Sequence, residues 1–496
     1  MPEKLLIANR GEIAVRIMRA CRDLGLETVA VFSEADRSAL HVRHADYAIA
    51  VGPPPARESY LVPERLLAAA RATGARYVHP GFGFLSENAD FAKAVIDAGL
   101  VWVGPDPSSI AAMGSKTESR KRMIEAGVPV VPGMTTPAKD AEEIRAFGRA
   151  NGFPLLLKAA AGGGGKGMRV VREESEVDAA FERTSSEARS FFADEAVYAE
   201  LYVEDPRHIE IQVLGDRTGR IVSLGERECS LQRRHQKVVE ECPSAAVSPG
   251  LRARMGEVAV AAARAVNYVS AGTVEFLLAK DGRFFFLEMN TRIQVEHPVT
   301  EMVYGVDLVV EMIRIAQGKP ISFSEVPEPR GHAIECRVYA EDPANGFAPS
   351  PGVIETLRWA SGPGIRLDAG IEEGDRVPLD YDPMLAKLLA WGPDREVARR
   401  RMLRALAETR IEGIETSIAF YQTLLSEPAF VSNDLSTQFL DRYVYAPKSE
   451  DDGALEEFAL VAAALQATGK ARRARGPGST SPSAWRTARP THGLRD

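Results

Sequence analysis

Apolar residues in the first hundred positions recur with the periods of alternating strands and helices. A helix is predicted where they return every three or four positions, at Ile13, Ile17, Cys21 and Leu24. Short apolar runs predict strands at 4–8, 27–32 and 77–78. Further helices are expected at 63–72 and 91–98. Alternation at this pitch is typical of a parallel, doubly wound sheet.

Beyond Lys116 the pattern changes to that of an antiparallel α+β region. Residues 152–172 contain an apolar strand, a glycine loop and a second strand. Other strands are predicted at 197–203, 208–214, 274–278 and 284–289, and a helix at 250–266. A third region has short strands separated by Pro and Gly, followed by a helix at 395–409.

The chain of 496 residues is too long for one hydrophobic core, so about three lobes are expected. The predicted fold class combines α/β and α+β architecture. We expect an N-terminal doubly wound lobe at 1–115, a central domain with a mobile glycine-loop lid at 116–320, and a C-terminal α+β lobe at 331–446. Residues 448–496 are basic, rich in Pro, Ser and Gly and without a periodic apolar face, which predicts a disordered tail.

Composition narrows the class of protein. The net charge of −8 argues against non-specific nucleic-acid binding. The four cysteines form no CxxC pair, which disfavours a zinc site or a disulfide framework and fits a reducing cytosol. No signal layout begins the sequence, and no apolar run reaches the roughly 18 residues of a membrane span. These features predict a soluble, cytoplasmic protein with no nucleic-acid or membrane partner.

The glycine loop occupies residues 162–167, GGGGKG. It formally satisfies GxGxxG, but the β-favouring segment MRVVR follows it where a dinucleotide-binding loop would open a helix. No Ser or Thr follows Lys166, so it is not a Walker loop. Its backbone N–H groups can still cradle phosphates, with Lys158 and Lys166 supplying positive charge. A flexible hairpin tip without a ligand remains the alternative.

Two glutamates are predicted to face each other across a hairpin. If Asp281-Gly282 is a two-residue turn, Lys280 lies opposite Arg283 and Glu275 lies opposite Glu288. Carboxylates directly opposite on a sheet repel each other, and their neighbours here are apolar.

A divalent cation would resolve that repulsion. Oxygen ligands close to phosphates suit magnesium, and Asn290 shares the face of Glu288 two residues earlier. The alternative is that Glu275 and Glu288 reach solvent or pair with arginines.

If the chain stays extended beyond this point, Arg292, Gln294 and Glu296 continue the same face. Arginine suits a small planar oxyanion, and a carboxylate beside it can remove the proton from the oxyanion's hydroxyl. The set therefore indicates activation of a small acid by the γ-phosphate of ATP.

Several segments, taken in order, resemble biotin carboxylase of the ATP-grasp superfamily along residues 2–446. They are IANRGEIAVRI (7–17), HPGFGFLSEN (79–88), KAAAGGGGKGM (158–168), RHIEIQV (207–213), ERECSLQRRHQKVVEE (226–241), EMNTRIQVEHPVTE (288–301) and YDPMLAKL (381–388). Any one of them could occur by chance, but all of them at family-like spacing are specific.

The resemblance implies a role for each matching position. ATP contacts are implied for Lys116, Lys158, Gly162, Gly163, Gly164, Gly165, Lys166, Gly167, Glu200, Val203, His208 and His235. The implied metal ligands are Glu275, Glu288 and Asn290. Bicarbonate and biotin contacts are implied for Phe82, Lys237, Arg292, Gln294, Val295 and Arg337. Among the catalytic residues Lys237, Arg292, Glu296 and Arg337, the resemblance makes Glu296 the base that deprotonates bicarbonate and Arg337 the cation that stabilises the biotin enolate. His235 and Lys237 would share a face if that segment is extended.

The resemblance also implies cofactors and partners. These are ATP, Mg²⁺ (or Mn²⁺), a biotin on a separate biotin carboxyl carrier protein, carboxyltransferase subunits, and a homodimer. The reaction would be the first half-reaction of acetyl-CoA or another acyl-CoA carboxylase, as in malonyl-CoA formation for fatty acid biosynthesis. Phe82 stands where the family usually has tyrosine, and the sequence contains no Met-Lys-Met triplet for biotin attachment.

Two other functions are compatible with parts of the pattern. One is an ATP-grasp ligase that joins a carboxylate to an amine, which would need a different acid pocket. The other is a non-catalytic subunit that binds nucleotide and acts as a scaffold, which loss of charged catalytic residues would indicate.

Overall fold

The N-terminal region forms a parallel sheet whose strands alternate with helices. The computed structural model describes residues 2–160, 167–192, 194–447, 460–461 and 463–464. The five strands of this sheet, all paired in parallel, lie in the order β3 (Tyr47–Gly52), β2 (Glu27–Ser33), β1 (Lys4–Ile7), β4 (Tyr77–His79) and β5 (Val101–Trp102). The helices are α1 (Gly11–Asp23), α2 (Leu40–His44), α3 (Pro63–Thr73), α4 (Ala89–Asp97) and α5 (Pro107–Gly114), with 3-10 turns η1 (Glu34–Asp36) and η2 (Ala56–Glu58).

Both faces of this sheet are buried. Leu5 and Ile7 belong to a core cluster that includes Ile13 of α1. Leu6, between them in sequence, belongs to a second cluster that includes Phe91 of α4. Successive strand residues point to opposite faces, so helices cover the sheet on both sides. The predicted doubly wound region is confirmed.

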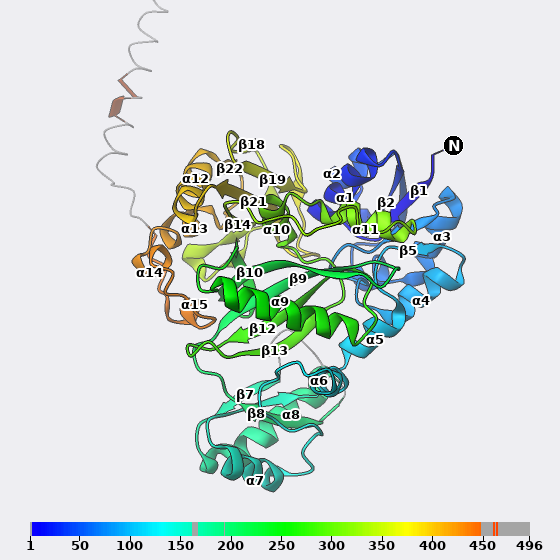
Figure 1. Cartoon of the computed structure of the whole chain (residues 1–496). Helices are drawn as coiled ribbons and strands as arrows, with labels where there is room; N and C mark the ends of the chain where they lie inside the picture. Colours follow the sequence, from blue (N-terminus) through cyan, green and yellow to red (C-terminus); the bar gives the residue numbers. More distant parts are fainter. Residues whose placement is uncertain (1, 161–166, 193, 448–459, 462, 465–496) are drawn as a thin grey trace, which may run out of the picture. The chain divides into compact units, whose positions relative to one another are not determined.

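A small antiparallel sheet follows, shown at the bottom of Figure 1. Its strands lie in the order β7 (Met168–Val171), β6 (Leu155–Ala159) and β8 (Val197–Leu201). The helices of this region are α6 (Lys116–Glu125), α7 (Ala141–Asn151) and α8 (Val177–Phe192), with the turn η3 (Glu174–Glu176). The loop joining β6 to β7 lies outside the described residues from 161 to 166, so the lid stays a prediction.

An eight-stranded antiparallel sheet links the centre of the chain to its C-terminal part. Its order is β13 (Phe284–Asn290), β12 (Ser270–Leu278), β9 (Arg207–Gly215), β10 (Ile221–Arg233), β11 (Gln236–Cys242), β14 (His332–Tyr339), β21 (Met384–Gly392) and β19 (Ile365–Ala369). Its associated helices are α9 (Pro249–Arg264), α10 (His297–Tyr304) and α11 (Leu308–Ala316). Figure 1 shows α9 running along the part of the sheet made by β9 and β10.

Short elements complete residues 1–445, which form one of two units of the chain. They are β15 (Glu341–Asp342), η4 (Pro343–Asn345), β16 (Ala348–Pro349), β17 (Gly352–Val353), β18 (Thr356–Arg358), β20 (Arg376–Val377), α12 (Arg395–Glu408), β22 (Arg410–Glu412), α13 (Ile418–Leu424), α14 (Pro428–Val431) and α15 (Phe439–Arg442). The parallel, antiparallel and mixed regions confirm the predicted fold class. The second unit, 446–496, lies almost wholly outside the described residues, and so does the predicted disordered tail.

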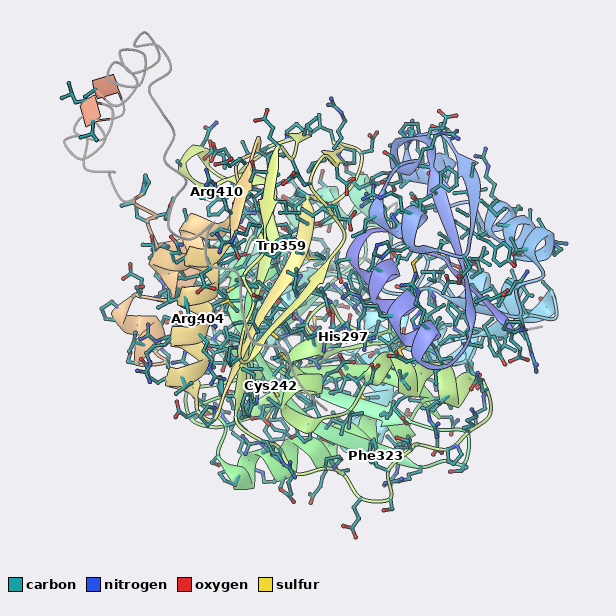
Figure 2. The ribbon with its side chains drawn as sticks, turned by 90° about the horizontal axis from the view of Figure 1, so that it is seen from above. Cys242, His297, Phe323, Trp359, Arg404 and Arg410 are labelled. Atoms are coloured by element: carbon teal, nitrogen blue, oxygen red, sulfur yellow. The ribbon has the colours of Figure 1, made fainter. Side chains whose placement is uncertain are left out.

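The cysteine side chains lie in the interior of the protein. Figure 2 shows Cys242 and His297 among the packed side chains of the interior, and both are fully buried. All four cysteines are buried and free. Among the described residues, no helix has the length and apolar character needed to cross a membrane.

Candidate active site

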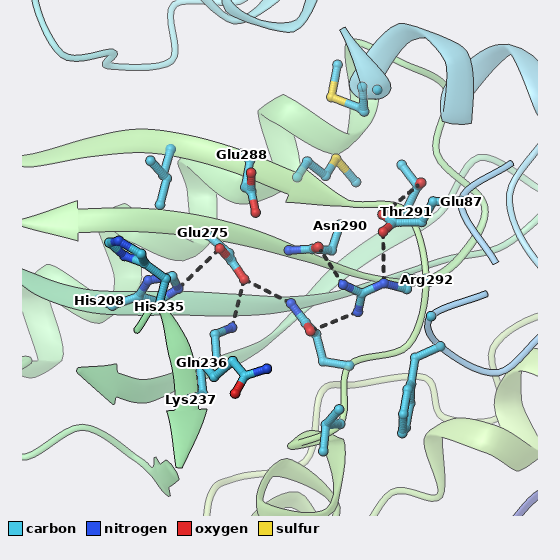
Figure 3. A pocket seen from close by; sticks show the side chains of 18 of the residues that line it. Glu87, His208, His235, Gln236, Lys237, Glu275, Glu288, Asn290, Thr291 and Arg292 are labelled. Atoms are coloured by element: carbon cyan, nitrogen blue, oxygen red, sulfur yellow. Dashed lines mark hydrogen bonds and ion pairs between the residues drawn. The ribbon is translucent and has the colours of Figure 1, made fainter. Parts of the chain in front are cut away.

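A cavity of about 1020 Å³ collects most of the predicted site residues. Phe82 and Glu87 reach it from the loop after β4, and Arg337 reaches it from β14. The lining also includes the predicted residues Lys116, Lys158, Glu200, His208, His235, Lys237, Glu275, Glu288, Asn290, Arg292, Gln294 and Val295. Figure 3 shows many of these side chains converging from neighbouring strands. Val203, which follows β8, is not among the lining residues, and neither is Glu296, which lies behind the lining residues Lys237 and Arg337 and contacts both.

Glu275 and Glu288 lie opposite each other on β12 and β13, as predicted. The turn that was expected to set this pairing is different. Ala279 donates its N–H to the Arg283 carbonyl at 2.8 Å, so Ala279, not Lys280, lies opposite Arg283. The hairpin loop has three residues and ends at Gly282, whose φ of 82° is left-handed. A register shift between Glu275 and Phe276 then restores the predicted pairing.

The paired carboxylates and Asn290 form an all-oxygen group that fits a divalent cation. The Glu288 side chain is exposed to the cavity it lines; desolvation by the surrounding cavity walls, and then the neighbouring Glu275 carboxylate, raise its pKa. Asn290 Oδ1 accepts from Arg292 Nη2 at 2.9 Å and keeps a second lone pair. Hard oxygen donors of this kind suit Mg²⁺ or Mn²⁺. Glu275, Glu288 and Asn290 would hold the ion, which would neutralise the phosphate oxygens of a bound nucleotide.

Replacing Glu288 by glutamine removes one anionic ligand and leaves the strand shape unchanged. We expect the Mg²⁺ concentration that gives half-maximal ATP turnover to rise by at least the roughly 10- to 100-fold that loss of an outer-shell partner costs. The control is Glu412→Gln, a strand glutamate that ion-pairs with Arg410 outside the cavity lining. A Mg²⁺ titration measures the effect, and an unchanged curve for Glu288→Gln would remove this residue from the metal site.

Lys237 joins three buried carboxylates. Its Nζ lies 2.5 Å from Glu210 Oε2, 2.7 Å from Glu275 Oε1 and 2.8 Å from Glu296 Oε1. Burial alone would lower the pKa of Lys237, but these carboxylates raise it well above its ordinary value. The ammonium therefore remains charged and offsets the repulsion among the three carboxylates.

The segment after β13 is not extended, which corrects the prediction for residues 291–296. The strand ends at Asn290, and a bend and a turn follow before α10 begins at His297. The predicted side chains nevertheless meet. Arg292 Nη1 donates to Gln294 Oε1 at 2.9 Å, and Gln294 Nε2 donates to Glu275 Oε1 at 2.9 Å. Hydrogen bonds, rather than strand alternation, bring these groups to one place.

Glu296 lies between two cations. Its Oε1 accepts from Lys237, and its Oε2 accepts from Arg337 Nη2 at 3.0 Å. Burial alone would raise the pKa of Glu296, but Lys237 and Arg337 hold it well below its ordinary value. The carboxylate is ionised at neutral pH. Arg337 is fixed from the other side by Glu240, whose Oε1 accepts from Arg337 Nε at 2.6 Å.

His235 does not share a strand face with Lys237, contrary to the prediction. Arg234 and His235 form the two-residue turn between β10 and β11, with φ of 50° and 66°. Both left-handed positions are those of a type I′ hairpin, which glycine and asparagine normally occupy. His235 still reaches the cavity from this turn.

A second cluster of charge lies where nucleotide contacts were predicted. Glu200 accepts from Lys158 Nζ at 2.5 Å and from Arg120 Nη1 at 2.8 Å. Burial, and then the neighbouring Lys158, lower the pKa of Lys116, which Glu288 partly offsets. His208 Nε2 lies 3.2 Å from Glu275 Oε2, which connects this cluster to the carboxylate pair. Of the glycine loop, only Gly167 is described, so the other loop contacts lie outside the described residues.

Sequence reasoning missed the residues that hold the predicted ones. Arg227 is fully buried and donates to Glu210 from Nε. Glu87 Oε2 accepts from Arg292 Nε at 2.9 Å. The sequence does carry a signal for Glu210, because it lies two residues from His208 on a predicted strand and therefore shares its face. The roles of Glu87 and Arg227 depend on contacts between distant segments, which a single sequence does not show.

Comparisons with known proteins agree along the chain. Family models match residues 1–110 (Biotin carboxylase, N-terminal domain), 115–324 (Carbamoyl-phosphate synthase L chain, ATP binding domain) and 335–442 (Biotin carboxylase C-terminal domain). Biotin carboxylase 1 of Bacillus subtilis is 50% identical over 445 residues, covering 89% of this chain and 99% of that protein. The propionyl-CoA carboxylase alpha chain of Ruegeria pomeroyi is 46% identical over 503 residues, covering 96% and 73%.

Solved structures give the same result. The biotin carboxylase–β-γ-ATP complex from Campylobacter jejuni has a TM-score of 0.87 at 42% identity, and the match covers 89% of this chain and 99% of that one. The biotin carboxylase domain of Hydrogenobacter thermophilus 2-oxoglutarate carboxylase, in complex with MgADP and bicarbonate, has a TM-score of 0.85 at 44% identity, covering 90% and 99%.

The nucleotide-sized cavity, the paired carboxylates and the matched ATP-binding region define an ATP-grasp protein. Within that class, the chain belongs to the biotin carboxylase family.

Proposed function

We propose that the chain uses ATP and bicarbonate to carboxylate a biotin carried by a separate protein. The observation that carries this proposal is the meeting of Lys237 and Arg337, which line the cavity, with the buried carboxylate of Glu296. A carboxylate held between two cations, beside an arginine and a metal-type carboxylate pair, suits a small acid that must lose a proton before phosphorylation. Membership of the family makes the activity that of a ligase acting on biotin.

The first step is activation of bicarbonate. Glu296 accepts the proton from the bicarbonate hydroxyl. A carboxylate with a low pKa is a weak base, so Lys237 and Arg292 must also lower the pKa of the bound bicarbonate. A carbonate oxygen then attacks the γ-phosphorus in line, the bond to the β-phosphate oxygen breaks, and ADP and carboxyphosphate form. Lys116 and Lys158, which also line the cavity, neutralise phosphate oxygens.

The second step transfers the carboxyl group. Carboxyphosphate breaks at its C–O bond to carbon dioxide and phosphate, and the phosphate accepts the ureido proton of biotin. Arg337 stabilises the negative ureido oxygen, and the ureido nitrogen attacks carbon dioxide. Phe82 retains the aromatic ring at the cavity wall but lacks a hydroxyl, so this side chain offers biotin no hydrogen bond.

The biotin and its acceptor are assigned to partner chains. This chain covers 99% of the length of Biotin carboxylase 1 of Bacillus subtilis, a relative that is a biotin carboxylase by name, which supports a carrier on a separate chain. We propose a biotin carboxyl carrier protein as the direct partner, carboxyltransferase subunits as the consumers of carboxybiotin, a homodimer as the assembly, and the cytoplasm as the location. Acetyl-CoA, giving malonyl-CoA for fatty acid biosynthesis, is one acyl acceptor; relatives named pyruvate and propionyl-CoA carboxylases represent others.

The test is phosphate release from ATP with bicarbonate and free biotin. We expect release to depend on bicarbonate and to increase when free biotin is added. Turnover that needs an amine instead of bicarbonate would support the rival carboxylate–amine ligase. A protein that binds nucleotide but releases no phosphate would support the alternative of a non-catalytic scaffold subunit.

A further inference from the structure

We propose that Lys387 is a positioning residue for the bicarbonate pocket, acting through the backbone of Val295. The inference deepens the proposed function and rests on it. Lys387 Nζ donates to the Val295 carbonyl at 2.9 Å, although Lys387 lies on β21, more than 90 residues along the chain. Val295 lines the cavity and immediately precedes Glu296.

Lys387 is a charged residue buried in an otherwise apolar stretch of strand β21. Its neighbours Leu385, Ala386, Leu388 and Leu389 are apolar and buried, and Lys387 itself is fully buried. Lysine is almost never fully buried unless it is paired, because an isolated buried ammonium is very costly. A lysine retained in such a strand therefore has a specific partner.

The register of the sheet places Lys387 next to the catalytic arginine. Arg337 and Lys387 are direct cross-strand partners on β14 and β21. Like charges directly opposite are destabilising, so this arrangement needs compensation. The two cations contact consecutive residues of one segment: Arg337 contacts the Glu296 carboxylate at 3.0 Å, and Lys387 contacts the Val295 carbonyl.

The turn before α10 has no strand partners, so each of its carbonyls is held individually. The Gln294 carbonyl accepts from His297 Nδ1 at 2.7 Å, and the Glu296 carbonyl accepts from the Val299 N–H at 3.3 Å. Lys387 supplies the bond for the carbonyl between them. Without it, the Val295 carbonyl loses a charge-assisted bond, and the turn that aims Glu296 loses an anchor.

The charge of Lys387 is balanced from other segments. Glu12 Oε2 of α1 lies 3.2 Å from Nζ, and Asp368 Oδ2 of β19 lies 3.9 Å from it. Asp368 is also paired with Arg366 at 2.8 Å, whereas Glu12 has Lys387 as its ion-pair partner. Lys387 thus connects α1, the eight-stranded sheet and the turn at Val295 and Glu296, which we call the pocket turn.

The experiment compares Lys387→Met with the double variant Lys387→Met/Glu12→Gln. The single variant removes the bond and leaves a buried carboxylate without a partner. The double variant removes both charges, which is far less costly to folding than leaving one of them unpaired. Steady-state ATP cleavage is measured against bicarbonate and, separately, against ATP. Glu12→Gln alone reports any effect of the helix carboxylate.

In both Lys387 variants we expect the KM for bicarbonate to rise by about tenfold or more, because small misplacements of reacting groups have large kinetic costs. The KM for ATP should stay within about twofold, since the substitutions leave the predicted nucleotide contacts around Lys158 and Glu200 unchanged. Arg395→Met is the matched control, because it breaks another ion pair of the C-terminal region, with Glu241 at 2.7 Å, away from the pocket turn. It should lower thermal stability and leave the KM for bicarbonate unchanged.

A folded double variant with wild-type KM for bicarbonate would overturn the positioning role and leave the proposed function intact. A parallel rise in both KM values would also overturn it, because that result would indicate general loosening of the structure. Wild-type protein without bicarbonate-dependent ATP cleavage would instead overturn the proposed function itself.

Discussion

Glutamine in place of Glu296 is expected to reduce bicarbonate-dependent ATP cleavage by about 100- to 10,000-fold, the range that removal of a general base usually costs. The amide keeps the size of the side chain and can still accept from Lys237 or Arg337. It cannot take a proton from bicarbonate. ATP affinity should stay within about twofold, because Glu296 does not belong to the charged cluster around Lys158 and Glu200 where the nucleotide contacts are predicted.

Phosphate release and nucleotide binding, measured on the same preparations, separate these effects. Glu226→Gln is the matched control: Glu226 is also fully buried and ion-paired, but its partners are Arg252 at 2.7 Å and Ser244, and not the cavity residues Lys237 and Arg337. It should retain turnover. If Glu296→Gln turns over like this control, another group deprotonates bicarbonate.

Replacing Arg337 by alanine should reduce biotin carboxylation by about 100- to 1000-fold, the usual cost of losing a donor to a developing oxyanion. Biotin-independent ATP cleavage should fall much less. Some loss is expected there too, because Arg337 also donates to Glu296 at 3.0 Å and helps to hold the base.

The two activities are measured on one sample, as carboxybiotin formed and as phosphate released without biotin. The ratio of the two losses decides the role of Arg337. Equal losses would show that Arg337 acts only through Glu296 and does not stabilise the biotin enolate.

The larger elements were predictable because their patterns are local. The strand–helix alternation of the N-terminal sheet and the strands of the hairpin follow from side-chain periodicity alone. The pairing of Glu275 with Glu288 was also correct, although the assumed turn was not. Two deviations cancelled: a three-residue loop shifted the register by one, and the irregularity beside Phe276 shifted it back.

The details that failed are those set by tertiary contacts. An extended course through residues 291–296 is the condition for one shared strand face, but contacts from Glu87, Lys237 and Lys387 shape that segment as a turn. His235 and Lys237 would share a face only on an extended segment, whereas His235 occupies a left-handed turn that its residue type does not favour. Helical and strand periods describe single segments, so they say nothing about a lysine that reaches across from another strand.

The central claim is that bicarbonate attacks the γ-phosphate of ATP while Glu296 holds its proton. Turnover in oxygen-18 bicarbonate, with the released phosphate analysed by mass spectrometry, tests it most directly. The attacking oxygen stays on phosphorus when carboxyphosphate breaks down, so each phosphate should carry one atom of label from bicarbonate. Phosphate that carries no label from bicarbonate, and takes its new oxygen from water, would contradict the account.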